Sequence, residues 1–201
     1  MNKRIVPIPA RMQHLERDAR GYPIPFNIWR DTDGVAHFTI NDHKKAALCV
    51  EENRCPICGQ SLDKTMWFVG GPMSAFHPNG CYIDQPMHEE CSRYALQVCP
   101  YLAAPKYAGR IDARTVDPAK MQDNTIFKDP TMLPDRPLVF VRVETHSYTV
   151  LKQRAENQDL LHLRPLRPYL SIGFWRGGAL LSQAEAEQAV RNIKEDTSNG
   201  R

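Results

Sequence analysis

A chain of 201 residues has room for one domain of ordinary size with an appendage, and 42% apolar residues suffice for a real hydrophobic core. The 26 Lys and Arg residues nearly balance 23 Asp and Glu, which excludes a dedicated polyanion binder and leaves room only for a local basic patch. No apolar run approaches the roughly 20 residues that span a bilayer, and the N-terminal stretch lacks a secretory apolar segment. We therefore expect a cytoplasmic protein with no membrane partner.

The first part of the chain predicts an arm, a hairpin and a helix. Residues 1–20 are polar and charged without a sustained apolar period, which indicates an arm or a short helix. Two apolar-aromatic runs, Phe26–Trp29 and Val35–Ile40, flank the letters DTDG, and Asp-Gly between such runs is a strong hairpin signal. Asn41 or Asp42 can cap the helix that the letters HKKAALCVEEN predict.

The cysteine-rich middle predicts a strand followed by a second helix. The letters TMWFVGGPMSAF indicate a strand or hairpin broken by Gly70, Gly71 and Pro72. The letters MHEECSRYALQV indicate a helix, whose first turn suits Pro86 because that position needs no intrahelical N–H, and which Pro100 ends.

The last third predicts two strands and a helix after a proline-rich span. Residues 103–137 carry five prolines and few apolar pairs, which indicates a linker or a strap over the surface. The letters PLVFVRVET indicate a strand with Val139, Val141 and Val143 on one face, and SYTVLKQ is a candidate continuation. The letters PYLSIGFWRGG indicate another strand, with Gly173 as a possible bulge.

A capping box predicts the start of the C-terminal helix. Ser182 and Glu185 match the pattern S-x-x-E before the letters LSQAEAEQAVRNIKED. The helix has a narrow apolar stripe, formed by Ala186, Ala189, Val190 and Ile193. Because helices and strands do not alternate as βαβ units, the predicted class is α+β.

Two pairs of metal-binding residue types define a candidate zinc site. Because thiols stay reduced in the cytoplasm, six cysteines there indicate metal ligands and buried thiols more than disulfides. Cys55 and Cys58 lie on one tight turn, which Gly59 helps to close. His88 and Cys91 share a face at the start of the predicted helix, where the helix dipole favours a thiolate. The alternative is a chance Cys-x-x-Cys with ordinary residues at 88 and 91.

Over about residues 50–100, the sequence predicts a Cys-x-x-Cys knuckle, then a hairpin, then a helix that carries two ligands. This order of elements resembles a treble-clef zinc finger. The resemblance implies a zinc-stabilised core. Together with the predicted elements, we expect an α+β fold with an N-terminal β-hairpin packed on that core and a C-terminal strand and helix unit. The predicted organisation is an arm at 1–20, a hairpin plus zinc-binding domain at 21–102, a strap or linker at 103–137 and the C-terminal unit at 138–201. Four strong ligands leave no position for water, so the Zn²⁺ is expected to be structural.

The other three cysteines have separate expectations. Cys49 lies on an apolar helix face and is expected to be a buried thiol. Cys81, in the loop HPNGCYID, is a substitute ligand if His88 is not one, and Cys99 is expected to pack on the same helix as Cys91.

Treble clefs also occur in the His-Me finger nucleases, and the loop FHPNGCYID resembles their catalytic hairpin. The resemblance implies His77 as the catalytic base, with Asn79 and Asp84 in the interval of the metal ligands. The usual Asp-His or His-His pair is absent, because Phe76 precedes His77. The alternative interpretation of His-Pro-Asn-Gly is a tight turn.

Basic residues suggest two regions that could contact a partner. The zinc helix has Arg93 beside two glutamates, which disfavours it as a groove reader. The better candidates are Arg11, Arg17 and Arg20 in the arm. A second set interleaves basic and aromatic residues and could bind phosphates and bases or a protein surface: Arg164, Arg167, Tyr169, Trp175 and Arg176. The alternative for this set is a solvated face plus core residues.

Longer stretches, among them RDARGYPIPF, DGVAHFTIND and FWRGGALLSQAEA, are similar to small phage, prophage and bacterial proteins. This similarity implies a mobile-element context, and with it a regulator or a host-directed inhibitor. We therefore expect a non-catalytic, zinc-stabilised binding protein that acts on a protein or nucleic-acid partner and needs no small-molecule cofactor. The alternative is a divergent metal-dependent nuclease that uses His77.

Overall fold

The computed structural model of the protein describes residues 6–103, 137–154 and 159–198, so the predicted strap at 103–137 lies almost entirely outside it. The described helices are η1 (Ala10–Met12, 3-10), α1 (His43–Glu51), α2 (Pro72–Phe76), α3 (Glu89–Val98), α4 (Pro100–Ala103) and α5 (Gln183–Ser198). The described strands are β1 (Ile28–Arg30), β2 (Ala36–Asn41), β3 (Met66–Gly70), β4 (Phe140–Thr145), β5 (Tyr148–Arg154), β6 (Asp159–Pro165), β7 (Ser171–Arg176) and β8 (Ala179–Leu180).

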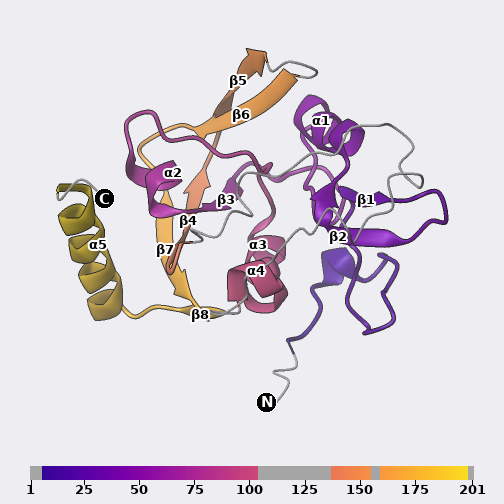
Figure 1. The fold of residues 1–201 in the computed structure, drawn as a ribbon, viewed down its shortest axis with the longest axis horizontal. Coiled ribbons are helices and arrows are strands. Elements are labelled where there is room, and N and C mark those ends of the chain that lie inside the picture. The colour runs from indigo at the N-terminus through magenta and orange to yellow at the C-terminus, as the bar shows by residue number, and fades with distance from the viewer. Residues whose placement is uncertain (1–5, 104–136, 155–158, 199–201) are drawn as a thin grey trace.

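These elements form a mixed α/β fold with three antiparallel sheets. A central sheet has the order β3-β4-β7-β8, and β1-β2 and β5-β6 form two-stranded sheets. Figure 1 shows the central sheet between two ends of the molecule, with α1 and the β1–β2 hairpin at one end and α5 at the other. Within the described ranges, no helix is long and apolar enough to cross a membrane.

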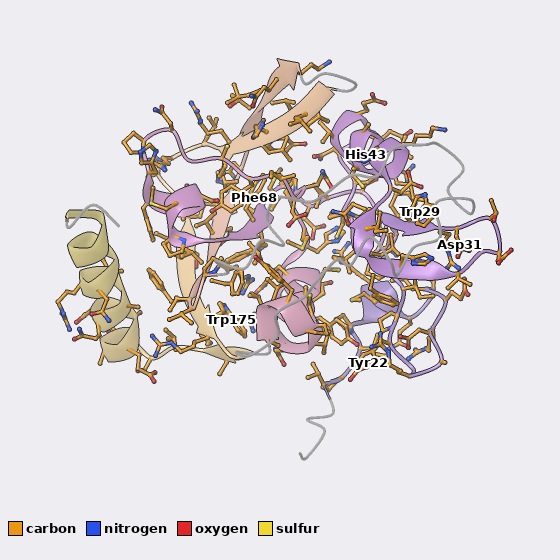
Figure 2. All side chains as sticks on the ribbon, viewed as in Figure 1. Tyr22, Trp29, Asp31, His43, Phe68 and Trp175 are labelled. Atoms are coloured by element: carbon orange, nitrogen blue, oxygen red, sulfur yellow. The ribbon has the colours of Figure 1, made fainter. Side chains whose placement is uncertain are left out.

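The central sheet separates two apolar cores, because β3 and β4 are buried on both faces. The first core contains Met12, Cys55, Cys58, Val69, Met87, Cys91, Tyr94, Leu96, Phe140 and Trp175. The second core contains Met66, Phe68, Ala75, Tyr82, Val141, Val143 and Leu163. Val141 and Val143 share one face of β4 as predicted, and Figure 2 shows Phe68 near the middle of the molecule. The short apolar runs of β3 and β4 thus mark strands covered on both sides.

The predicted N-terminal hairpin and its following helix are confirmed. β1 pairs with β2 in antiparallel register, and Asp31 accepts hydrogen bonds from the N–H groups of Asp33 and Val35 in the turn. Figure 2 places Asp31 toward the outer end of this hairpin. Asp42 caps α1 by accepting from the N–H groups of Lys44 and Lys45.

The polar N-terminal stretch contains an apolar period that the sequence interpretation overlooks. Met12 is 1% exposed and belongs to the first core, and Ile8 and Leu15 pack against it. All three side chains pack together in the first core, although helical geometry spans only η1. Residues 6–15 are therefore part of the packed structure.

The segment after β3 corrects the prediction of a local hairpin. Gly70 ends β3, and Pro72 begins the short helix α2 rather than a second strand. Where the chain comes back beside β3, it forms one antiparallel bridge, in which Trp67 and Met87 exchange N–H···O bonds of 2.8 and 2.9 Å. The full strand partner of β3 is β4, some seventy residues further along. Helix α3 begins at Glu89, so Pro86 lies before the helix and not in its first turn.

The C-terminal unit also differs from the prediction in two places. SYTVLKQ is not an extension of β4 but a separate strand, β5, which pairs with the unpredicted strand β6. Gly173 is not a bulge, because it pairs in regular register with Arg142 of β4. The capping box is confirmed, since Glu185 accepts hydrogen bonds from both the N–H and the hydroxyl of Ser182.

Candidate metal centre

The structure brings together the four predicted zinc ligands. Their ligand atoms, three thiols and one imidazole nitrogen from Cys55, Cys58, His88 and Cys91, all lie within 4.8 Å of one another, and all four residues are buried. Zn–S bonds of about 2.3 Å and Zn–N bonds of about 2.0 Å at tetrahedral angles require ligand atoms roughly 3.5–3.8 Å apart. The distances from His88 Nδ1 to the sulfurs of Cys58 and Cys91, 3.2 and 3.9 Å, lie on either side of that range. The donor set therefore fits Zn²⁺ in both type and spacing.

The first two thiols lie on a turn fixed by its own backbone and by the hairpin. The Gly59 N–H donates to the Cys55 carbonyl at 2.8 Å, which closes the Cys-x-x-Cys turn. Gly59 has a φ of +74°, and a Cβ there would come within 2.8 Å of the Phe26 ring, so this position requires glycine. The N–H groups of Phe26 and Asn27 donate to carbonyls of the turn, at Ile57 and Pro56.

The other two ligands lie at the start of α3. His88 is the N-cap residue, and Cys91 is the third residue of the helix. The Trp67–Met87 bridge fixes the backbone immediately before His88, so β3 positions this ligand. The N-terminal end of the helix dipole favours negative charge on the Cys91 sulfur.

The hydrogen bonds of His88 determine which nitrogen can bind the metal. Its Nε2 lies 2.9 Å from the Ser61 carbonyl, which can only accept, so Nε2 carries the proton. Nδ1 then has a free lone pair facing the sulfurs of Cys58 and Cys91. A histidine whose second nitrogen donates to a backbone carbonyl is the usual arrangement of a metal-bound imidazole.

Protons alone satisfy the four buried groups poorly. Hydrogen bonds with Cys55 and Cys91 lower the pKa of Cys58 far below that of an ordinary thiol, whereas the side chains of Cys55 and Cys58 steeply raise the pKa of Cys91. Although burial opposes the imidazolium, hydrogen bonds with Cys55 and Cys58 raise the pKa of His88 to about 10. Ionisation of one thiol disfavours ionisation of the thiol beside it, and a bound divalent cation would allow both to be thiolates.

The N-terminal stretch covers this cluster, which the sequence interpretation missed. The Arg11 guanidinium pairs with Glu90 at 2.7 Å and Asp63 at 3.0 Å, and Nη1 lies 3.3 Å from His88 Nε2. His14 Nε2 lies 3.1 Å from the Cys58 carbonyl. The apolar spacing that buries Met12 is the signal that could have revealed this cover.

Arg142 links the cluster region to the central sheet. Its side chain is 5% exposed, and the guanidinium lies 3.5 Å from the centre of the Trp67 ring. Nη2 is 3.5 Å from Glu89, the first residue of α3. Burial lowers the pKa of Arg142 to about 10. The start of the ligand-bearing helix is thereby tied to β3 and β4.

The three remaining cysteines lie outside the cluster. Cys49 is fully buried as predicted, and burial raises its pKa to about 12. Cys81 does not substitute for a ligand, because its sulfur lies 3.4 Å from His162 Nδ1 instead. Cys99 is the C-cap residue of α3 and is half-buried.

His77 occupies a turn on the surface. Its Nδ1 accepts a hydrogen bond from the Asn79 N–H, and the side chain is exposed at the end of α2. Asp84 is also exposed, with its Oδ1 3.5 Å from Asn41 Nδ2. In the part of the chain that is described, the Cys55–Cys58–His88–Cys91 group alone brings three or more His, Cys, Asp or Glu ligand atoms together.

The predicted basic and aromatic set is distributed over several environments. Trp175 is 5% exposed in the first core, and Figure 2 shows it between β7 and the α3–α4 pair. Arg176 is exposed at the end of β7, and Arg164 lies on β6. Trp175 is thus placed as an interior residue.

Arg167 and Tyr169 do lie together. The Arg167 guanidinium lies 5.7 Å from the centre of the Tyr169 ring and donates to the carbonyls of Ala75 and His77 at 2.7 and 2.8 Å. The Tyr169 hydroxyl donates to the Ala75 carbonyl at 2.8 Å. Both side chains thereby fasten the segment before β7 to the end of α2.

Comparison with known proteins does not assign the chain to a family. No family model matches it, and neither curated proteins nor solved structures give a significant match. The site and the surface chemistry therefore carry the functional argument.

Proposed function

We propose that this is a zinc-stabilised binding protein that performs no chemistry at its metal. The observation that carries the proposal is the closeness of four buried ligand atoms, within 4.8 Å of one another. Three thiolates and one imidazole are soft and borderline ligands that suit Zn²⁺. Four protein ligands complete its tetrahedral shell, so no position is left for a water or a substrate.

The bound metal would stabilise the fold as it does in a treble clef, here with the hairpin between the two ligand pairs shortened to one strand and one bridge. A Cys-x-x-Cys knuckle, the strand β3, a single return bridge at Met87 and the helix α3 follow one another in the order of that motif. Because the metal would join the Cys-x-x-Cys turn to the start of α3, the free energy of metal binding would contribute directly to folding.

The surface best suited to a partner lies over α2 and β7. We call it the α2–β7 surface and define it by its exposed apolar residues: Met73, Phe76, Leu170 and Ile172. Phe76 stacks on Phe174 of β7 with ring centres 5.9 Å apart, and Phe174 lies on the same face of β7 as Ile172. Met73 is 52% and Ile172 45% exposed, and exposed apolar side chains that gather on one surface commonly mark a binding site.

The charges favour a protein partner over a nucleic acid. Many described arginines are already paired with carboxylates, which reduces the positive potential available to phosphates. These pairs are Arg11 with Asp63 and Glu90, Arg20 with Asp18, Arg30 with Glu16, Arg54 with Glu52, and Arg93 and Arg142 with Glu89. Binding without catalysis suits a regulator or an inhibitor that acts by covering a surface of its target.

Metal analysis and a matched pair of surface variants test the proposal. Protein purified under reducing conditions should contain one zinc per chain, and a chain without zinc would contradict the metal assignment. Ile172→Glu should abolish binding of a purified partner, whereas Leu180→Glu should not, because Leu180 pairs with Trp175 and lies on the other face of the sheet with similar exposure. Equal loss in both variants, or salt-sensitive retention on heparin with no protein partner, would refute the proposed surface.

A further inference from the structure

A second thiol and imidazole pair lies away from the metal cluster, on the side of the second core. Cys81 Sγ and His162 Nδ1 are 3.4 Å apart, although the two residues are 81 positions apart in the chain. Cys81 follows α2, and His162 lies in β6. Figure 1 shows the segment between α2 and α3 passing beside this strand.

A backbone bridge holds this pair in place. Tyr82 and Leu163 exchange two N–H···O bonds of 2.7 Å, and both of their side chains are buried in the second core. Because side chains alternate along extended backbone, Cys81 and His162 leave the bridge on its opposite face, together with Arg164. Gly80 lets this segment pack closely against the end of α2, since a Cβ there would clash with the carbonyls of Ser74 and Met73. The contact is therefore fixed by the fold.

The strand that carries His162 also carries a cation on the same face. From β5, the residues opposite His162 and Arg164 are Leu151 and Thr149, which carry no charge, and the Arg164 guanidinium lies on the same face of β6 as the imidazole. Both carry a nitrogen that is shielded from solvent and has no hydrogen-bond partner among the described residues, His162 Nε2 and Arg164 Nε. Cys81 itself is only half-buried and remains accessible.

The donor count and the missing partner exclude two other uses of the pair. The two donors are too few for a zinc site, and neither belongs to a group of three or more ligand residues within the described ranges. No described acceptor orients His162 through Nε2, as hydrolytic thiol enzymes require. What remains is a nucleophile with a proton acceptor and a nearby cation.

We propose that Cys81 is a reactive thiol, activated by His162, that exchanges with low-molecular-weight disulfides bearing carboxylates. The Sγ proton passes to His162 Nδ1, and the thiolate attacks one sulfur of the disulfide R–S–S–R. A new S–S bond forms to Cys81 as the old one breaks, and the leaving RS⁻ takes the proton from the imidazolium as RSH. Arg164 favours a carboxylate on the incoming disulfide. The product is a reversible mixed disulfide at Cys81, on the side of the Tyr82–Leu163 bridge that faces away from the second core.

The test uses the zinc-loaded full chain with glutathione disulfide as the carboxylate-bearing probe and bis(2-hydroxyethyl) disulfide as the neutral one. Peptide mass spectrometry should find Cys81 modified at pH 7 at least about tenfold faster than half-buried Cys99, because an ordinary thiol is only a few per cent ionised there. His162→Gln should slow Cys81 by about tenfold at pH 7 and move the midpoint of its rate against pH upward. Arg164→Gln should slow reaction with glutathione disulfide and leave the neutral probe unaffected.

Each outcome decides the proposal. Equal rates at Cys81 and Cys99, or a pH profile unchanged by His162→Gln, would overturn it. If His162→Gln does not fold, the wild-type profile decides: an activated thiol reaches its plateau below about pH 8, whereas an ordinary thiol is still rising there. An Arg164→Gln variant that slows both probes equally would overturn the assignment of the carboxylate-bearing class.

Discussion

Cysteine and histidine lie close together on both sides of the central sheet, but in opposite arrangements. On the first-core face, three cysteines and His88 are buried, and the second nitrogen of the imidazole already donates to a carbonyl. On the second-core side, one half-buried cysteine faces His162, whose second nitrogen lacks a described partner. The number of donors and the burial therefore decide the chemistry: a closed set holds a metal, whereas an open pair is available to react.

The largest expected effect comes from removing one thiol on each face. Cys55→Ser should lose zinc and cooperative unfolding, because structural zinc contributes roughly 10–16 kcal/mol in zinc-finger peptides and whole domains are stable by only about 5–15 kcal/mol. Cys81→Ser should retain zinc and change the free energy of unfolding by less than about 1 kcal/mol. Metal analysis and thermal unfolding followed by circular dichroism measure both. Equal damage in the two variants would erase the distinction between the faces.

Two substitutions at His88 test whether its imidazole is a ligand of the metal. His88→Cys should still bind zinc, since four thiolates also form a tetrahedral site. His88→Ala should weaken zinc binding by more than about 100-fold, because loss of an outer-shell partner alone already costs 10–100-fold. Competition with a chromophoric chelator gives both affinities. Unchanged affinity in His88→Ala would show that the imidazole is not a ligand.

The N-terminal cover over the cluster should contribute less. Arg11→Met removes the pairs with Glu90 and Asp63 and should lower the free energy of unfolding by about 1 kcal/mol while zinc is retained. Arg20→Met, which removes the single pair with Asp18, is the matched control and should cost less. Chemical denaturation compares the two variants. A loss of zinc in Arg11→Met would mean that the guanidinium holds the cluster together.

The smallest expected effect is the contribution of the N-terminal hairpin to the loss of stability in acid, which is separate from the loss of metal in acid. The hydrogen bond from His37, with the N–H groups of Val35 and Asp33, lowers the pKa of Asp31 in the folded state. A lowered pKa adds stability above the unfolded value of about 3.9, and this stability is lost as pH falls through the folded value. Asp31→Asn should therefore flatten the dependence of stability on pH below about 4. If stability depends on pH below about 4 as strongly in Asp31→Asn as in the wild type, the acid sensitivity comes from other groups.

The metal ligands could be predicted because both pairs are local in sequence. Cys55 and Cys58, and likewise His88 and Cys91, lie three residues apart, and short spacing fixes their geometry before any tertiary contact is known. The pairing of β3 with β4 could not be predicted, because nothing local in Met66–Gly70 specifies a partner some seventy residues away. The Cys81–His162 contact escaped for the same reason.

Other misses have local causes. The break after β3 at Gly70, Gly71 and Pro72 was predicted, but helix α2 was missed, because proline was counted only as a breaker although it is well tolerated in the first turn of a helix. Strand β6 was missed although Leu161 and Leu163 alternate with His162 and Arg164, because its charged residues obscured a period of two. In both cases the signal was present but a competing interpretation of single residues outweighed it.

The late pairing of β3 has a consequence for how the protein is made. All four ligands lie between Cys55 and Cys91, so a nascent chain can capture zinc before the strands of the C-terminal unit have emerged from the ribosome. β3 cannot pair until β4, which begins at Phe140, has been made. Until then, the apolar side chains of β3 that belong to the second core stay exposed. Zinc supply during translation should therefore determine how much newly made protein escapes aggregation, more than zinc supplied to the finished chain.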